Sequence, residues 1–139
     1  MKSIRIFLML FVSASISLSA ASIDDLTYTV NGDTITITDC NISASGELVI
    51  PDTIDGLPVT VIGEKAFSEC ENLTTVIIAS TVTTIGVSAF ERCESLSSIN
   101  IPNSVVGIAD STFERCESLT SITIPDSVTS IGKGAFKNC

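Results

Sequence analysis

The sequence predicts an α/β repeat solenoid, a coil in which units of 23 residues stack on one another. Three kinds of core-type residue recur at this interval, as columns along the stack: Phe67, Phe90, Phe113 and Phe136; Leu73, Leu96 and Leu119; Cys70, Cys93, Cys116 and Cys139. A fixed period of this length indicates repeated units, none of which folds alone. The period therefore constrains the architecture strongly and the biochemical function only weakly.

The unit LTSITIPDSVTSIGKGAFKNC at residues 119–139 shows the strands of each repeat. Residues 121–124 alternate polar and apolar, which indicates a strand that completes the segment beginning at Leu119. Pro125 ends this strand, because proline cannot continue a hydrogen-bonded ladder. Residues 128–131 form a second, shorter extended piece, so each unit contributes one longer and one shorter strand.

The end of the same unit predicts a turn followed by a short helical piece. Gly132 permits a tight turn with positive φ. Ala135, Phe136 and Cys139 have the spacing of about one turn of α-helix or 3₁₀ helix. Ala109 replaces this glycine one unit earlier, so we expect strain there if the position requires positive φ.

The front half of the first unit is five residues longer than its counterparts, and the insertion lies around Asp55-Gly56-Leu57-Pro58. This composition predicts a turn. Upstream, the sequence from Tyr28 to Ile37 predicts a β-hairpin, because Asn31-Gly32 is a strong two-residue hairpin turn. We therefore expect a β-hairpin cap over residues 22–47 and a repeat array over residues 48–139, with about four coils and an incomplete last one.

The first 21 residues have the layout of a secretory signal peptide. Lys2 and Arg5 precede an apolar run, and small residues follow at 19–21, with cleavage expected after Ala21 or Ser22. A membrane anchor is the alternative, but the apolar stretch of about 15 residues is broken by serines, whereas a span needs about 20. We expect a secreted or cell-surface protein that does not insert into membranes after cleavage.

Composition excludes several function classes. Loss of Lys2 and Arg5 leaves five basic residues against 16 acidic ones, a net charge near −11, which disfavours nucleic-acid binding. The chain contains no His, the usual general base and metal ligand. No phosphate loop, metal cluster or nucleophile–base pair is present, so we expect no enzyme, no cofactor and no metal.

Recurring glutamates at 71, 94 and 117 leave calcium binding open, although an exposed edge shared with Arg92 and Arg115 is the simpler interpretation.

Cysteines in a secreted chain suggest disulfides at first sight. Four of the five, however, occupy the same place in consecutive units beside core-type Phe and Leu. A free cysteine behaves as a small buried hydrophobe. We therefore expect structural free thiols stacked as a packing column.

The repeat resembles the BspA-like class of leucine-rich repeats, whose unit is LxxIxIPxxVxxIGxxAFxxCxx. The similarity covers roughly residues 48–139, and the last unit matches at nearly every constrained position. The resemblance implies a right-handed, leucine-rich-repeat-like coil, often opened by a β-hairpin cap. It also implies secreted or cell-surface proteins of bacteria and some protists that mediate adhesion or partner binding, although a shared fold does not transfer a function.

The outward positions of the longer strands form the candidate binding face. They are rich in hydroxyl groups and recur in three successive units: Thr74, Thr75, Ile77; Ser97, Ser98, Asn100; Thr120, Ser121, Thr123. We expect this face to bind a protein or glycan, since repeat proteins usually bind through such surfaces. The alternative is that these residues only solvate a sheet.

Two further expectations concern the last repeat and possible glycosylation. The array stops at Cys139 inside a unit, so the chain is either a fragment of a longer surface protein or a structural module whose open end stacks on another chain, giving end-to-end self-association. Asn41 and Asn72 stand in glycosylation sequons, which matter only in a eukaryotic source.

Overall fold

The computed structural model describes residues 20–139, so the predicted signal peptide lies almost wholly outside the described residues. The described chain opens with η1 (Ile23–Asp25), a 3₁₀ turn capped by Ser22. The Ser22 hydroxyl accepts from the Asp24 amide, and the Ser22 amide donates to the Asp25 carboxylate at 2.9 Å. Within residues 20–139 the structure has no helix with the length and apolar character needed to cross a membrane.

The predicted hairpin is confirmed. Strands β1 (Leu26–Asn31) and β2 (Thr34–Cys40) pair antiparallel around a turn in which Gly32 has φ 62°. Strand β2 also pairs in parallel with β5 (Leu57–Ile62). The second strand of the hairpin is therefore also the first rung of the solenoid.

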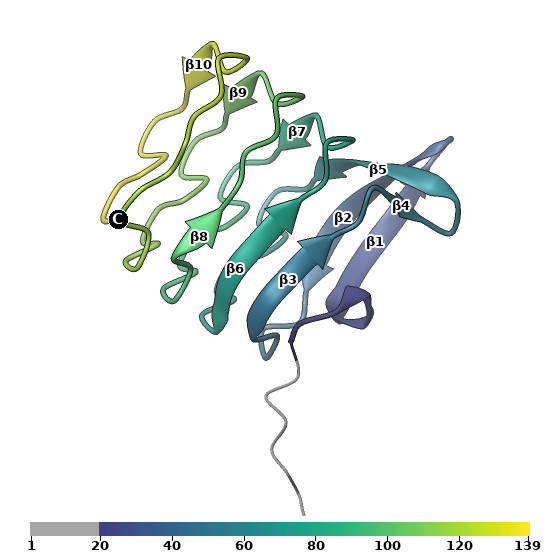
Figure 1. Cartoon of the computed structure of the whole chain (residues 1–139), viewed down its shortest axis with the longest axis horizontal. Coiled ribbons are helices and arrows are strands. Elements are labelled where there is room, and N and C mark those ends of the chain that lie inside the picture. Colours follow the sequence, from purple (N-terminus) through teal and green to yellow (C-terminus); the bar gives the residue numbers. More distant parts are fainter. Residues whose placement is uncertain (1–19) are drawn as a thin grey trace, which may run out of the picture.

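The array is a β-solenoid of about four coils, as predicted, with two strand walls (Figure 1). The front wall is the parallel sheet of β3 (Gly46–Ile50), β6 (Leu73–Ile78) and β8 (Ser98–Ile99). The back wall runs from β2 through β5 to β7 (Thr84–Ile85), and separately pairs β9 (Gly107–Ile108) with β10 (Ser130–Ile131). Each coil crosses the front wall first and the back wall second.

The insertion in the first coil forms the predicted turn. Strand β4 (Thr53–Ile54) pairs antiparallel with the start of β5, and the two central residues Asp55 and Gly56 have φ 52° and 79°. Positive φ at both central positions is the geometry of a tight hairpin turn. The five extra residues therefore leave the coil as a small hairpin and do not disturb the stacking.

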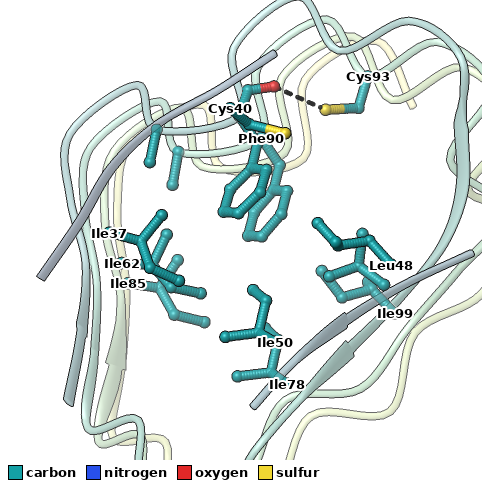
Figure 2. Packing of buried hydrophobic residues seen from close by; sticks show 14 of the residues in the cluster. Ile37, Cys40, Leu48, Ile50, Ile62, Ile78, Ile85, Phe90, Cys93 and Ile99 are labelled. Atoms are coloured by element: carbon teal, nitrogen blue, oxygen red, sulfur yellow. Dashed lines mark hydrogen bonds between the residues drawn. The ribbon is translucent and has the colours of Figure 1, made fainter. Parts of the chain in front are cut away.

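Apolar columns fill the space between the walls. Figure 2 shows Ile37, Ile62 and Ile85 in line on one side and Leu48 and Ile99 on the other. The phenylalanines form a continuous stack in the centre, with ring centroids 4.9, 5.6 and 5.4 Å apart and planes within 11° of parallel. The first three of these rings are fully buried, and burial of one such side chain is worth about 1.5–3 kcal/mol.

The predicted helical piece around each Ala-Phe-x-x-Cys is wrong, because the described chain forms a series of tight turns there. Two residues of each such segment, four positions apart, have positive φ, for example Lys65 at 57° and Glu69 at 64°. Every second amide group of the segment points toward the next coil, so Phe67 N donates to Ala89 O at 2.8 Å. The segment is thus a third wall, held by hydrogen bonds between coils, and no α-helix forms within residues 20–139.

All five cysteines are free thiols, and all of them except Cys139 are buried. The column that we predicted from four positions gains a fifth member, Cys40, which is 3% exposed. Cys93 and Cys116 donate from Sγ to the carbonyl oxygen of a phenylalanine in the preceding coil, each at 3.1 Å. Burial raises the pKa of Cys93 and raises the pKa of Cys116 to about 12.

The repeated glycine serves close packing rather than the predicted positive φ. Neither Gly86 nor Gly132 has positive φ. A Cβ added at Gly86 would lie 2.6 Å from Glu64 N, and one at Gly132 would collide with Asp110 N, so the coils approach too closely there for any side chain. In the last unit, positive φ falls instead two residues later, at Gly134.

Ala109 therefore acts by bulk and not by the φ strain that we expected. Gly86 N donates to Ile62 O at 2.8 Å and Gly132 N to Ile108 O at 2.7 Å, but the equivalent bond from Ala109 to Ile85 is absent from the described residues. The back wall is accordingly interrupted between β7 and β9. A methyl group at the closest approach of two coils accounts for this interruption.

The predicted strand over residues 119–124 does not form. These residues lie along the front wall but do not pair with β8 within the described chain. Within residues 20–139 this coil has one neighbouring coil, and Ile122 and Ile124 are half-buried where the equivalent residues of earlier coils are buried.

Candidate binding face

The structure places the nine predicted residues on the outer side of the front wall. The residues between them point inward: Leu73 and Val76 are at most 1% exposed, and Leu96 is fully buried. Eight of the nine are exposed and Thr75 is half-buried. The alternation of polar and apolar residues therefore predicted the face correctly, while its role in binding stays a prediction.

Two of these side chains hold neighbouring coils together. The Asn100 amide accepts from Ile78 N at 2.7 Å and donates to Ile78 O at 2.9 Å, so it pairs with that backbone as another peptide group would. The Ser97 hydroxyl donates to Thr74 O at 3.1 Å. These polar groups are committed to the fold, which leaves them less available to a ligand.

The remaining hydroxyl groups on the face have no such role. Ser98, Ser121 and Thr123 make no side-chain hydrogen bond within the described part of the chain. The backbone of residues 120–124 is likewise outside every backbone ladder there. Donors and acceptors therefore remain open on both sides of the junction between the third and fourth coils.

A hollow of about 430 Å³ lies at this junction. It is lined by five predicted residues and five others: Ser97, Ser98, Asn100, Ser121 and Thr123; Ile99, Ile101, Asn103, Ile122 and Pro125. The isoleucines supply apolar surface, and the hydroxyl groups of Ser98, Ser121 and Thr123 with the Asn103 amide supply polar contacts, the combination found in most binding sites.

The hollow was not predictable from the repeat pattern. It arises because residues 119–124 fail to pair with β8, and the periodic sequence predicts a strand there as in every other unit. Asn103 was missed because it belongs to the turn after the strand. Its departure from the aspartate that stands at the equivalent position 126 was the one available indication.

The lining of the hollow carries no charged and no aromatic residue. This neutrality contrasts with a chain of net charge −9. A charged ligand would find no paired partner, and burying an unpaired charge is costly. Sugar-binding sites commonly stack the ring on an aromatic face, which this hollow lacks. The lining therefore offers neutral polar and apolar contacts, with neither an ionic partner nor an aromatic ring.

Two ion pairs lie along the turn wall, between residues that do not line the hollow. Arg92 pairs with Glu69 at 3.1 Å and Lys137 with Glu114 at 2.8 Å, each across one coil step. The hydrogen bond from Lys137 lowers the pKa of Glu114, with a smaller contribution from Ser111. Among residues 20–139, no three His, Cys, Asp or Glu side chains are grouped closely enough to hold a metal ion.

Comparison with known sequences and structures identifies the repeat. The sequence model of the BspA type leucine rich repeat region matches residues 33–139 in six copies. A leucine rich repeat protein from T. pallidum is 30% identical over 87% of this chain and 68% of its own, with a TM-score of 0.75. A search of curated proteins finds no significant match.

Two longer bacterial structures share the fold. A leucine-rich repeat protein from Bacteroides ovatus is 38% identical over 84% of this chain, with a TM-score of 0.76. A leucine rich cell surface protein from Faecalibacterium prausnitzii is 28% identical over 84%, with a TM-score of 0.78. This chain spans only 32% and 30% of the length of these two structures.

Proposed function

The chain belongs to the BspA type leucine-rich repeat family, and on that premise we propose that it is a secreted or cell-surface binding module that recognises a protein partner through its front face. The observation that carries the proposal is the neutral hollow between β8 and residues 119–124, which lies on the face that the sequence predicted. The signal-peptide-like N-terminus and the cell-surface description of the F. prausnitzii structure support the location. The family consists of repeat proteins, and that this member is not an enzyme stays a prediction.

An uncharged, extended peptide segment fits the hollow best. The backbone groups of residues 120–124 are outside any ladder, and an extended peptide binds such groups through its own main chain. The hydroxyl groups of Ser98, Ser121 and Thr123 then contact peptide side chains and fix the register. A glycan is the competing ligand.

The test is a selection with and without the hollow. A library of random 12-residue peptides is panned against the wild-type protein and counter-selected against Ser98→Arg/Ser121→Arg, which fills the hollow with two charged side chains. The control variant is Thr84→Arg, which places the same charge at an exposed position of β7 on the back wall. Selected peptides are expected to bind wild type and this control equally, and to bind the double variant with at least tenfold lower affinity. If the selected peptides bind both variants equally, the binding site does not lie on this face. If instead the wild-type protein binds a glycan on an array and the double variant does not, the ligand is a sugar.

End-to-end association is the second candidate function, and one observation favours it. Ile131 is 55% exposed and Phe136 is half-buried, although the other three stacked phenylalanines are fully buried. The fourth coil therefore presents apolar surface along the solenoid axis. Light scattering should show a mass that rises with concentration and falls again in Ile131→Lys. A single monomeric species at millimolar concentration would contradict this function.

A further inference from the structure

Two thiols meet at the start of the solenoid. Cys40 ends β2 and Cys70 ends the first full coil, and the side chains are 3% and 0% exposed. Both sulfur atoms approach the carbonyl oxygen of Asn41, at 3.7 Å for Cys40 and 4.0 Å for Cys70. Cys70 Sγ is also 4.0 Å from the carbonyl oxygen of Cys40 itself. The two side chains therefore share one small buried region.

Cys70 differs from the cysteines that follow it. Cys93, Cys116 and Cys139 each donate to a phenylalanine carbonyl oxygen of the preceding coil at 3.1–3.2 Å. The coil before Cys70 has no phenylalanine, because β2 leads directly into the short segment at residues 41–45. Cys70 is left with contacts at 4.0 Å, the outer limit for a sulfur hydrogen bond, and with Cys40 as its neighbour.

The electrostatics agree with direct contact between the thiols. Hydrogen bonding between the two side chains raises the pKa of Cys40 and lowers the pKa of Cys70. One thiol thus stabilises the thiolate of the other, as in dithiol pairs that exchange with disulfides. By contrast, burial dominates at Cys93 and Cys116 and raises their pKa values.

We propose that Cys40 and Cys70 form a disulfide when the protein meets a disulfide oxidant, and that this bridge ties the hairpin cap to the first full coil. Both sulfur atoms lie within 4.0 Å of the carbonyl oxygen of Asn41, so the two side chains start in one buried region. The bridge requires the two Cα atoms to lie about 4.4–6.8 Å apart. In every later pair of the column at least one thiol donates to a phenylalanine carbonyl oxygen, so only the first pair is free of such a bond.

The reaction needs a small-molecule disulfide, RS–SR, as oxidant. Because Cys70 is 0% exposed, the reagent reaches it when the chain around it opens locally. The Cys70 thiolate then attacks one sulfur of RS–SR, forming a mixed disulfide and releasing RS⁻. The Cys40 thiol then loses its proton to RS⁻ or solvent and attacks Cys70 Sγ, which releases the second RS⁻. Two protein thiols are oxidised to one protein disulfide, and one RS–SR is reduced to two RSH.

A hollow next to the two cysteines determines which charge the disulfide reagent should carry. It measures about 340 Å³ and is lined by residues that flank both cysteines: Ile42, Ser43, Glu69, Glu71 and Asn72. Two carboxylates at its edge repel anionic reagents and attract cationic ones. A cationic disulfide such as cystamine is therefore expected to react several-fold faster than glutathione disulfide, which is anionic.

The test uses the whole folded protein. Reduced protein is incubated with cystamine, denatured in an alkylating agent and digested with trypsin without reduction. The expected product links the peptide that ends at Lys65 to the peptide 66–92, two hydrogen atoms lighter than their sum, while Cys93 and Cys116 carry the alkyl group. Closing a loop of this size should raise the midpoint temperature by roughly 10 °C.

Matched variants complete the test. Cys93→Ser should still form the bridge and show the same thermal shift on oxidation, whereas Cys40→Ser should show no shift. Because Cys40→Ser removes a buried group, the peptide map of the wild-type protein decides the matter even if that variant folds poorly. Alkylated Cys40 and Cys70 after prolonged exposure to cystamine, or a bridge between Cys70 and Cys93, would overturn the proposal.

Discussion

Replacing Gly86 with alanine should destabilise the solenoid by interrupting the back wall between β5 and β7. The new Cβ would lie 2.6 Å from Glu64 N and 2.7 Å from Gly63 C, distances that side chains do not tolerate against backbone. The coils must separate, as they do between β7 and β9, where alanine occupies the equivalent position 109. Two backbone bonds are then lost, Gly86 N to Ile62 O at 2.8 Å and Thr83 N to Thr60 O at 2.9 Å.

The magnitude follows from these two bonds. Each is worth about 0.5–1.5 kcal/mol, so the loss is about 1–3 kcal/mol. Alanine also restricts the unfolded chain, which returns about 0.4–1 kcal/mol. We therefore expect Gly86→Ala to lower the free energy of unfolding by about 1–2 kcal/mol, measured by urea denaturation as a lower midpoint with an unchanged m-value.

Two further variants make the argument refutable. Ala109→Gly should do the reverse, because it lets β7 and β9 close, and should raise the urea midpoint. Gly107→Ala is the control, since its Cβ would lie 2.8 Å from the Ser130 hydroxyl, a side-chain atom that can move, and 3.7 Å from the nearest backbone atom, Ser130 O. If Gly86→Ala leaves the midpoint unchanged, or Ala109→Gly lowers it, close approach of the coils is not the reason for the glycine.

Three shorter predictions follow from the same contacts. Iodoacetamide should label Cys139 in the native protein well before Cys116, because Cys139 is exposed whereas burial raises the pKa of Cys116 to about 12; equal rates by mass spectrometry would contradict this. The mature chain should begin at Ser22, where the new ammonium group lies 2.9 Å from an Asp25 carboxylate oxygen, and N-terminal sequencing that starts at residue 23 would refute it. Glu114 has a lowered pKa, so its stabilising effect is present above its unfolded value near 4.3 and is lost as the pH falls. The urea midpoint of Glu114→Gln should accordingly lie below wild type at pH 7 and match it in strong acid.

Much of the architecture follows from the 23-residue period. Phenylalanine and leucine at a fixed interval predicted the buried columns, and alternation along each unit predicted which residues face outward. These features depend only on local spacing, which is visible in a single sequence. The two-residue hairpin turn at Asn31-Gly32 was predictable for the same reason.

The errors lie where contacts between coils override local spacing. The spacing of Ala135, Phe136 and Cys139 fits one helical turn, but the same segment of each earlier unit donates amide hydrogen bonds to the next coil and has positive φ at two residues. Gly132 suggested positive φ, although the structure needs it for close packing. Cys40 was missed because 30 residues, and not 23, separate it from Cys70.

The three walls of the coil do not contribute equally to its register. Backbone bonds across the turn wall recur at every coil junction, from Phe67 N to Ala89 O, Phe90 N to Thr112 O and Phe113 N to Ala135 O, at 2.8–2.9 Å. The back wall is interrupted once and the front wall opens after β8, yet the phenylalanine stack continues through both places.

The turn wall and the phenylalanine stack therefore hold successive coils in place without help from the front ladder. Exposed substitutions usually change stability by less than about 0.5 kcal/mol, so residues on the outer front face can change at little cost. Between β8 and residues 119–124, where the front-wall ladder is open, the backbone conformation can also change at little cost. A face that the fold does not need for its own stability is the one on which a new binding specificity can arise without unfolding the protein.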